Sequence, residues 1–315
     1  MLLVGNGRLI TRDEAFPYAE DGAVALDGEV IKEVGALSEL RAKYPNAEFV
    51  DARGGVIMPG LINVHTHIYS GLARGLSIDG FNPTNFLEVL DGQWWYIDRH
   101  LTLDGTRACA YATVLDCIRD GVTTIFDHHA SFCEIPGSLF AIKDVCQELG
   151  IRANLCYEVS ERDGAEKCGQ AIRENADFAR WAKEQDDDMI KAMFGGHALF
   201  TISDKTFDRM VAANNGRTGY HIHVSEGMND VYDSLQNYGR RPVQRLQDHG
   251  ILGPKTILGH CIHVNTAEME IIKETGTMVV NNPESNMGNA IGICPVLQLH
   301  KRGILLGMGT DGVFL

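Results

Sequence analysis

From residue 61 onward, short apolar segments alternate with longer segments in which apolar positions recur with a helical period. Apolar strands that alternate with helices are typical of a parallel sheet buried on both faces. Eight such strands make a (β/α)8 TIM barrel, which is the α/β fold class that we predict. An open doubly wound sheet is the alternative, but no glycine-rich dinucleotide fingerprint follows an early strand. The expected strands are residues 61–65, 121–127, 152–159, 189–197, 218–224, 256–262, 277–282 and 304–311.

Residues 1–58 have a different pattern. They contain short β-rich pieces separated by glycine and aspartate turns, and Asp27-Gly28 is a hairpin signal. We therefore predict two domains: residues 1–58 as the N-terminal part of a β-sandwich, and residues 59–315 as the barrel.

Composition narrows the class of protein. The 315 residues are 44% hydrophobic and 22% charged, which is ordinary for a globular chain. A net charge of −14 argues against a nucleic-acid partner and against an anionic membrane surface. No apolar stretch approaches the length that spans a bilayer, and the N-terminus does not read as a signal peptide. The eight cysteines form no Cys-x-x-Cys pair, so we expect reduced thiols and a cytoplasmic location.

One connection, residues 68–100, is unusually long. It lies between the first expected strand and the first long helix, and long connections in compact domains usually carry function. An equally good interpretation is that its aromatic side chains pack the loop onto the barrel rim. These side chains are Phe81, Phe86, Trp94, Trp95 and Tyr96.

Histidine and acidic residues gather where the expected strands end. His65 and His67 are two residues apart in the first strand, so their side chains would project together. The C-terminal strand ends carry the active sites of TIM barrels, and scattered structural histidines would not collect there. The other residues at these ends are Asp127, His128, His129, His197, His221, His223, Glu226, His260, His263 and Asp311.

This set of side chains indicates a metal site. Imidazoles with one carboxylate suit Zn²⁺ or Fe²⁺ better than Mg²⁺ or Ca²⁺. A catalytic ion of this kind keeps one position for water and lowers the pKa of that water. Glu226 is placed to carry a proton between the water and a leaving group. His260 could polarise the substrate, and Asp311 could bind the metal and accept the proton of the water.

Several motifs, taken in order, resemble those of the amidohydrolase superfamily. They are "PGLINVHTH" (59–67), "HVSE" (223–226), "GHCIH" (259–263) and "GTDG" (309–312). Two further stretches, "FGGHALFTISDKT" (194–206) and "NNPESNMGNAIGICPV" (281–296), resemble the deaminase and chlorohydrolase branch. Each motif alone is weak, but the combination is specific and spans the chain.

The resemblance implies a role for each matching residue. Glu226 matches the proton-shuttling glutamate, His260 a histidine that contacts substrate and hydroxide, and His197 a histidine that faces the substrate. The branch with two metals needs a lysine at the end of strand 4, whereas Lys191 lies near its start, so we expect one divalent transition metal, zinc before iron. The implied metal ligands are His65, His67, His223 and Asp311.

Three other residues are judged from position alone. Trp95 and His129 are further candidates for contact with the substrate. His221 lies one pleat deeper than His223, and we expect it in the core or behind the ligands rather than on the metal.

The predicted function is metal-dependent hydrolytic deamination of an amino-substituted, purine-like heterocycle, a small-molecule substrate. One alternative is hydrolysis of another C–N or C–Cl bond, and another is a truncated, non-catalytic metal-binding protein. A homodimer is the oligomeric state that we consider. Because relatives continue well past Asp311, we also expect that the barrel is truncated at strand 8 and that the C-terminus of the protein is missing.

Overall fold

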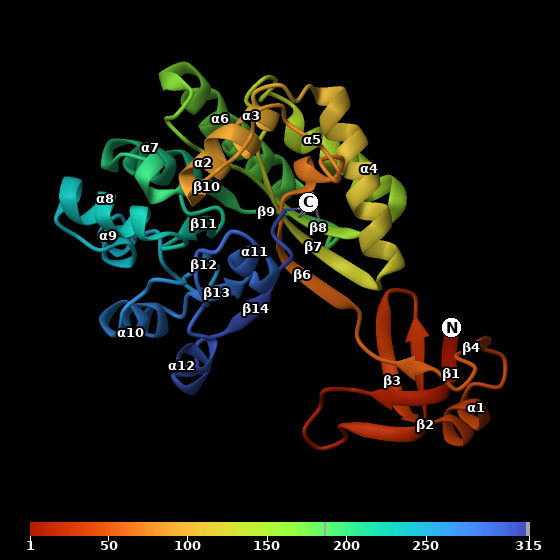
Figure 1. The fold of residues 1–315 in the computed structure, drawn as a ribbon. Helices are drawn as coiled ribbons and strands as arrows, with labels where there is room; N and C mark the ends of the chain where they lie inside the picture. The colour runs from red at the N-terminus through yellow and green to blue at the C-terminus, as the bar shows by residue number, and fades with distance from the viewer. Residues whose placement is uncertain (186, 313–315) are drawn as a thin grey trace. The chain divides into compact units, whose positions relative to one another are not determined.

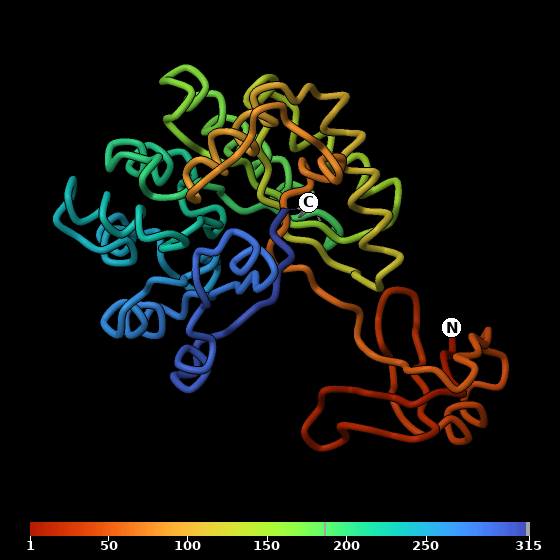
Figure 2. The backbone as a smooth tube through the Cα atoms, in the orientation of Figure 1, coloured from red at the N-terminus to blue at the C-terminus, as the bar shows by residue number. Residues whose placement is uncertain are grey.

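The computed structural model describes residues 1–185 and 187–312, and the chain divides into two compact units, Met1–Leu61 and Ile62–Leu315. The prediction had placed the boundary between residues 58 and 59. Figure 2 follows the course of the backbone through both units.

The first unit is a single five-stranded sheet with one helix packed against it. The expected hairpin is present, because Asp27 at the end of one strand pairs with Val30 at the start of the next. A small core of Leu3, Ala23 and Ala25 meets Leu40 of the helix. The strand order is β3-β2-β1-β4, with β5 also paired to β1, so a second sheet of the expected sandwich is not shown. The elements are β1 (Leu2–Ile10), β2 (Tyr18–Asp27), β3 (Val30–Ala36), α1 (Leu37–Lys43), β4 (Glu48–Asp51) and β5 (Val56–Ile57).

The second unit has a strand in each of the eight segments where one was expected. One of these segments, 189–197, holds two short strands that meet at Met193. The strands are β6 (Leu61–Thr66), β7 (Val122–His129), β8 (Arg152–Tyr157), β9 (Ile190–Ala192), β10 (Phe194–Ala198), β11 (Tyr220–Val224), β12 (Ile257–His260), β13 (Met278–Asn281) and β14 (Leu306–Met308).

These strands form two sheets, β6-β7-β8-β9 and β10-β11-β12-β13-β14, and the pairs with a recorded register are parallel. The chain changes partner at Met193, because β9 pairs with β8 whereas β10 pairs with β11. Two isolated parallel bridges, Val159 with Gly196 and Thr66 with Asp311, link the sheets. The pairing therefore describes two linked parallel sheets rather than the one continuous sheet of the expected barrel.

Helices connect the strands and surround the sheets in Figure 1. Local signals fix their ends: Asn265 and Glu268 form a capping box at the start of one helix, and Gly276 ends it with a positive φ. Among the described residues, no helix combines the length and the apolar character needed to cross a membrane. The main helices are α4 (Leu103–Arg119), α5 (Ser138–Leu149), α6 (Gly164–Glu184), α7 (Asp204–Asn214), α8 (Met228–Tyr238), α9 (Pro242–Asp248), α10 (Thr266–Thr275), α11 (Pro283–Gly288) and α12 (Val296–Lys301).

The long connection after β6 is largely helical. A 3₁₀ turn, η1 (Ile68–Ser70), follows the strand, and three helical pieces follow one another without a break: α2 (Phe86–Val89), the π-helical turn η2 (Leu90–Trp94) and α3 (Trp95–Asp98). π-Helical turns are rare in proteins as a whole, and those that occur frequently lie at functional sites. We call residues 86–98 the aromatic segment.

Candidate metal centre and substrate pocket

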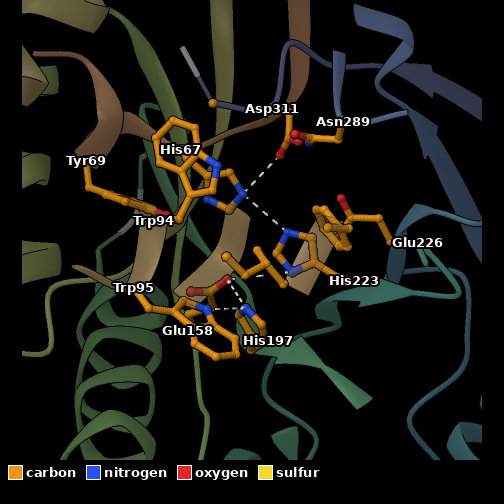
Figure 3. Close-up of a pocket in the computed structure, with 13 residues that line it drawn as sticks. His67, Tyr69, Trp94, Trp95, Glu158, His197, His223, Glu226, Asn289 and Asp311 are labelled. Atoms are coloured by element: carbon orange, nitrogen blue, oxygen red, sulfur yellow. Dashed lines mark hydrogen bonds and ion pairs between the residues drawn. The ribbon is translucent and has the colours of Figure 1, made fainter. Parts of the chain in front are cut away.

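Ligand atoms from three strands of the second unit converge on one point. His65 Nε2 and His67 Nε2 lie 2.9 Å and 3.0 Å from Asp311 Oδ1. His67 Nε2 also lies 3.2 Å from His223 Nε2. Ligand atoms about 2.0 Å from one tetrahedral ion are separated by roughly 3.3 Å. The spacing of these four side chains therefore fits a single metal ion, and Figure 3 shows three of them pointing toward one another.

The electrostatics of this centre favour a cation. Burial lowers the pKa of His65 to about 3, so this ring is neutral, as a metal ligand must be. Burial acts in the same direction on His67, but Asp311 and Glu158 outweigh it and raise the pKa of His67 to about 9. The two carboxylates thus favour a protonated, positively charged His67 ring. A bound divalent ion would supply positive charge at the same place.

The ring nitrogens that face away from the centre are partly held by neighbours. His65 Nδ1 lies 2.8 Å from His221 Nε2, and His67 Nδ1 donates to the carbonyl oxygen of His128 at 2.6 Å. His223 Nδ1 is buried without a hydrogen-bond partner among the described residues, and Glu158 Oε1 is 3.6 Å away. Contacts of this kind fix the tautomer and leave Nε2 to the metal. His221 lies behind the ligands, which is one of the two places expected for it.

The backbone at these strand ends is strained. Ser225, His260 and Asp311 have positive φ angles of 51°, 67° and 61°. Residues other than glycine rarely adopt this left-handed conformation, and such outliers collect at active sites and ligand clamps. Two of these residues, His260 and Asp311, lie at the centre, with His260 Nε2 3.8 Å from Asp311 Oδ2.

Glu226 and His260 lie beside the expected ligand Asp311. Glu226 Oε1 is 3.6 Å from His260 Nε2, which in turn is 3.8 Å from Asp311 Oδ2. His260 Nδ1 lies 2.8 Å from the side-chain oxygen of Asn286. Burial, followed by the negative charge of Asp311, raises the pKa of Glu226 well above its ordinary value. A raised pKa favours the protonated carboxyl group, which is the form that can donate a proton.

An aromatic pocket opens onto this centre. Its empty space, counted together with the open solvent at its mouth, is about 510 Å³. At its wall, His197 Nδ1 lies 3.1 Å from Thr201 Oγ1, and His197 Nε2 accepts a hydrogen bond from Trp95 Nε1 at 3.4 Å. The pocket is lined by His67, Tyr69, Phe86, Leu90, Trp94, Trp95, Glu158, His197, His223, Glu226, Asn289, Asp311 and Gly312.

Glu158 is a pocket residue that the sequence interpretation missed. It follows β8, is buried, and lies 3.4–3.8 Å from ring nitrogens of His128, His197 and His223. Burial opposes its charge, but the neighbouring histidines, His197 first, hold its pKa below the ordinary value. The signal was available, because Glu158 ends an expected strand just as the histidines do. It forms one group of close donor atoms with His67, His128 and His223, and a neighbouring group, His65, His223, His260 and Asp311, shares His223 with it.

Other sequence candidates lie away from the pocket. His129 is buried, with Nε2 3.0 Å from Ser131 Oγ, and is not among the lining residues. Its contact with substrate stays a prediction without support from the pocket geometry. Lys191 pairs with Asp188 and is not among the lining residues either.

Comparison with known proteins gives a consistent picture. Residues 56–314 match the sequence profile of the "Amidohydrolase family", and residues 22–47 match an "Imidazolonepropionase-like composite domain, bacteria". A 5-methylthioadenosine/S-adenosylhomocysteine deaminase of Thermoanaerobacter pseudethanolicus is 30% identical over 312 residues, which are 99% of this chain and 69% of the relative.

Two solved structures share the fold. An adenosine deaminase from Xanthomonas campestris with bound zinc is 25% identical, with a TM-score of 0.83 over 99% of this chain and 69% of the other. The atrazine chlorohydrolase TrzN from Arthrobacter aurescens in complex with zinc is 22% identical, with a TM-score of 0.83 over 99% of this chain and 72% of the other. The second likeness, at this identity, concerns the fold alone.

Proposed function

Because the chain belongs to the amidohydrolase family, as its motifs had indicated, we propose that it is a metal-dependent hydrolase that removes an amino group from a purine-like heterocycle. The observation that carries this proposal is the position of Asp311, in contact with His65 and His67 and on the wall of the same pocket as Glu226. The relatives reported above are named as deaminases, which supports the choice of an amino-bearing ring as substrate.

His65, His67, His223 and Asp311 would hold one divalent transition metal. Zinc is the first choice, since the neighbouring adenosine deaminase is described with bound zinc, and iron is the alternative. When bound, such an ion supplies a water molecule whose pKa lies near neutrality.

The remaining steps belong to side chains of this protein. Glu226 carries a proton to a ring nitrogen of the substrate and then to the departing ammonia. His260, 3.6 Å from Glu226, contacts the substrate at the carbon under attack and is held by Asn286. The rings of Phe86, Trp94 and Trp95 exclude water and hold a flat heterocycle by its faces.

The arrangement of the strands, the oligomeric state, the absence of other partners and the cellular location are proposals too. The two linked sheets together would make the eight-stranded barrel, with residues 1–58 as a separate β domain that is part of a sandwich. A homodimer, the absence of nucleic-acid and membrane partners, and a cytoplasmic location stay predictions.

Ammonia release tests the proposed function. The full chain would be loaded with one equivalent of Zn²⁺ or Fe²⁺ and assayed against adenine, guanine, their nucleosides and 5′-deoxyadenosine. We expect ammonia in stoichiometric amounts with the hydroxylated product from at least one compound. Release of chloride from a chlorinated triazine without ammonia from any amino-heterocycle would favour the alternative C–Cl hydrolysis. Metal binding without either product would favour the non-catalytic alternative.

A further inference from the structure

Trp95 forms part of two separate hollows in the second unit. Its side chain lines the aromatic pocket described above and also a more open groove of about 840 Å³ including its mouth. This outer groove lies between the aromatic segment and α8. Its other lining residues are Leu87, Glu88, Asp91, Phe200, Asn229 and Asp233. The indole of Trp95 is the side chain that the two hollows have in common.

The position of this indole is fixed on two sides. On the pocket side, Trp95 Nε1 donates to His197 Nε2 at 3.4 Å, as Figure 3 shows. On the other side, the guanidinium of Arg162 lies 4.9 Å from the centre of the indole ring. An arginine over an aromatic face is attracted by the ring quadrupole, and more strongly where water is excluded.

Arg162 is itself anchored to the aromatic segment. Its side chain is 6% exposed, and it forms a two-pronged ion pair with Asp98, which lies one helical turn after Trp95 and is 1% exposed. The same guanidinium lies 4.1 Å from the ring centre of Phe132. Arg99, the residue that follows the aromatic segment, adds a second link, since its Nε donates to Asp163 at 2.8 Å. Residues 162 and 163 thus bind the segment that carries Trp95 at three points.

Nothing in the proposed reaction requires this arrangement. Arg162 is not among the residues that line the pocket and does not contact the proposed metal ligands, yet it is buried and charged. Burial of an ion pair is costly and is retained where it fixes one geometry. The geometry fixed here is that of the wall between the pocket and the groove.

We propose that Trp95 sets the size limit of the substrate by separating the aromatic pocket from the outer groove, and that Arg162 is the positioning residue that holds it there. The choice of substrates in this inference rests on the proposed function, whereas the position of Trp95 between the two hollows does not. With the wall in place, the pocket ends at the indole, and the preferred substrate is a bare heterocycle. With the wall removed, a substituent on the ring can extend past position 95 into the groove.

The test compares a bare ring with the same ring carrying a sugar. The ratio of kcat/KM for adenosine to that for adenine, and for guanosine to guanine, would be measured for wild type, Trp95→Ala and Arg162→Lys. We expect Trp95→Ala to raise this ratio at least about tenfold, in the range that pocket contacts contribute to specificity. Arg162→Lys keeps a charge beside Asp98 but loses the planar stack on the indole, so we expect a smaller rise in the same direction.

Three further measurements separate positioning from general damage. The double variant Trp95→Ala, Arg162→Lys should show no more than the effect of Trp95→Ala alone, because the arginine acts through the indole. Acrylamide should quench the fluorescence of Trp95 more strongly in Arg162→Lys than in the parent, with Trp94 and Trp181 replaced by phenylalanine in both. Arg245→Lys is the matched control, since Arg245 is also buried, paired with Asp204 and stacked on Tyr238, but does not line either hollow.

The outcomes distinguish this inference from the proposed function. An unchanged ratio in Trp95→Ala, or the same change in Arg245→Lys, overturns the inference while deamination stands. If wild type releases no ammonia, the dissociation constants of adenine, adenosine, guanine and guanosine are measured instead. The affinity for each nucleoside is then divided by the affinity for its base. A shift in those constants then supports the inference although the proposed function fails, and the absence of any binding overturns both.

Discussion

Asp311 and His65 are 246 residues apart in the chain, yet Asp311 Oδ1 lies 2.9 Å from His65 Nε2. The contact joins the first and last strands of the second unit, where Thr66 and Asp311 also form a parallel bridge. Backbone hydrogen bonds from the amides of Thr310 and Asp311 to the carbonyl oxygen of His65, both 3.0 Å, fix the register. The metal centre and the junction of the two sheets are therefore built from the same residues.

Asp311→Asn should reduce the bound metal from one equivalent to well below one. The amide that replaces the carboxylate lacks the charge that His65 and His67 face at 2.9 Å and 3.0 Å. Metal content after dialysis, by atomic emission, measures the effect. Glu174→Gln is the control, because Glu174 is also a buried carboxylate but caps backbone amides of α5. Two equivalents in wild type, or full metal in Asp311→Asn, would contradict the single four-ligand centre.

His221→Gln should weaken metal binding without removing it. His221 Nε2 lies 2.8 Å from His65 Nδ1 and orients that ring. Residues that hold a ligand in this way typically contribute about 10- to 100-fold to metal affinity. Competition with a chromogenic chelator would give the change in Kd. His249→Gln, a change at the outer end of α9, should leave the Kd unaltered, and an equal loss in both variants would mean general destabilisation.

Much of this arrangement could be predicted because strand ends carry strong local signals. The pairing of His65 with His67 required only the alternation of strand positions, whereas Glu226 was selected by its place just past the strand that carries His223. The division of the fourth segment at Met193 could not be predicted, since it depends on which neighbour each half pairs with. The pairing of Arg162 with Asp98 is of the same kind, because nothing local in the sequence links the two positions.

The aromatic segment shows where the sequence left two interpretations open. Both hold in part: Phe86, Trp94 and Trp95 line the pocket, and Trp94 also packs against the core, while Tyr96 is exposed. Side-chain direction in a short helix depends on packing that a single sequence does not contain. Glu158, in contrast, could have been found by the same rule that selected the histidines.

Removal of the metal should lower the melting temperature. Asp311 and Glu158 are both buried close to His67, and without a cation their negative charges depend on ring protonation. A ligand at 100 times its Kd stabilises the folded state by about 2.7 kcal/mol. Thermal melts with and without a chelator would measure the shift. Asp311→Asn, which we expect to hold little metal, should show almost no shift with chelator, and a full shift in that variant would place the stabilising ion elsewhere.

Gly195→Ala should destabilise the second unit. A Cβ at this position would lie 2.3 Å from the carbonyl oxygen of Tyr157, so β8 and β10 would have to move apart. Overpacking of this kind typically costs about 1–3 kcal/mol. Urea unfolding would give the change in the free energy of unfolding. Gly35→Ala is the control, because the nearest atom to its Cβ would be 3.9 Å away and the entropy effect of Gly→Ala alone is stabilising; an equal loss there would argue against close approach as the cause.

Glu226→Gln should abolish most turnover and leave the metal in place. Glu226 is not among the four converging ligands, and its carboxyl lies 3.6 Å from His260 on the pocket wall, so its expected contribution is proton transfer. Loss of such a group typically lowers kcat about 10²- to 10⁴-fold. The glutamine keeps the size of the side chain and cannot exchange a proton, so metal content and the Kd for a substrate should change little. Ammonia release, atomic emission and ligand titration on the same preparation would give the three values. A variant that loses its metal would make Glu226 a ligand or a support of one, and a variant with kcat near that of wild type would assign the proton transfer to Asp311 or His260 instead.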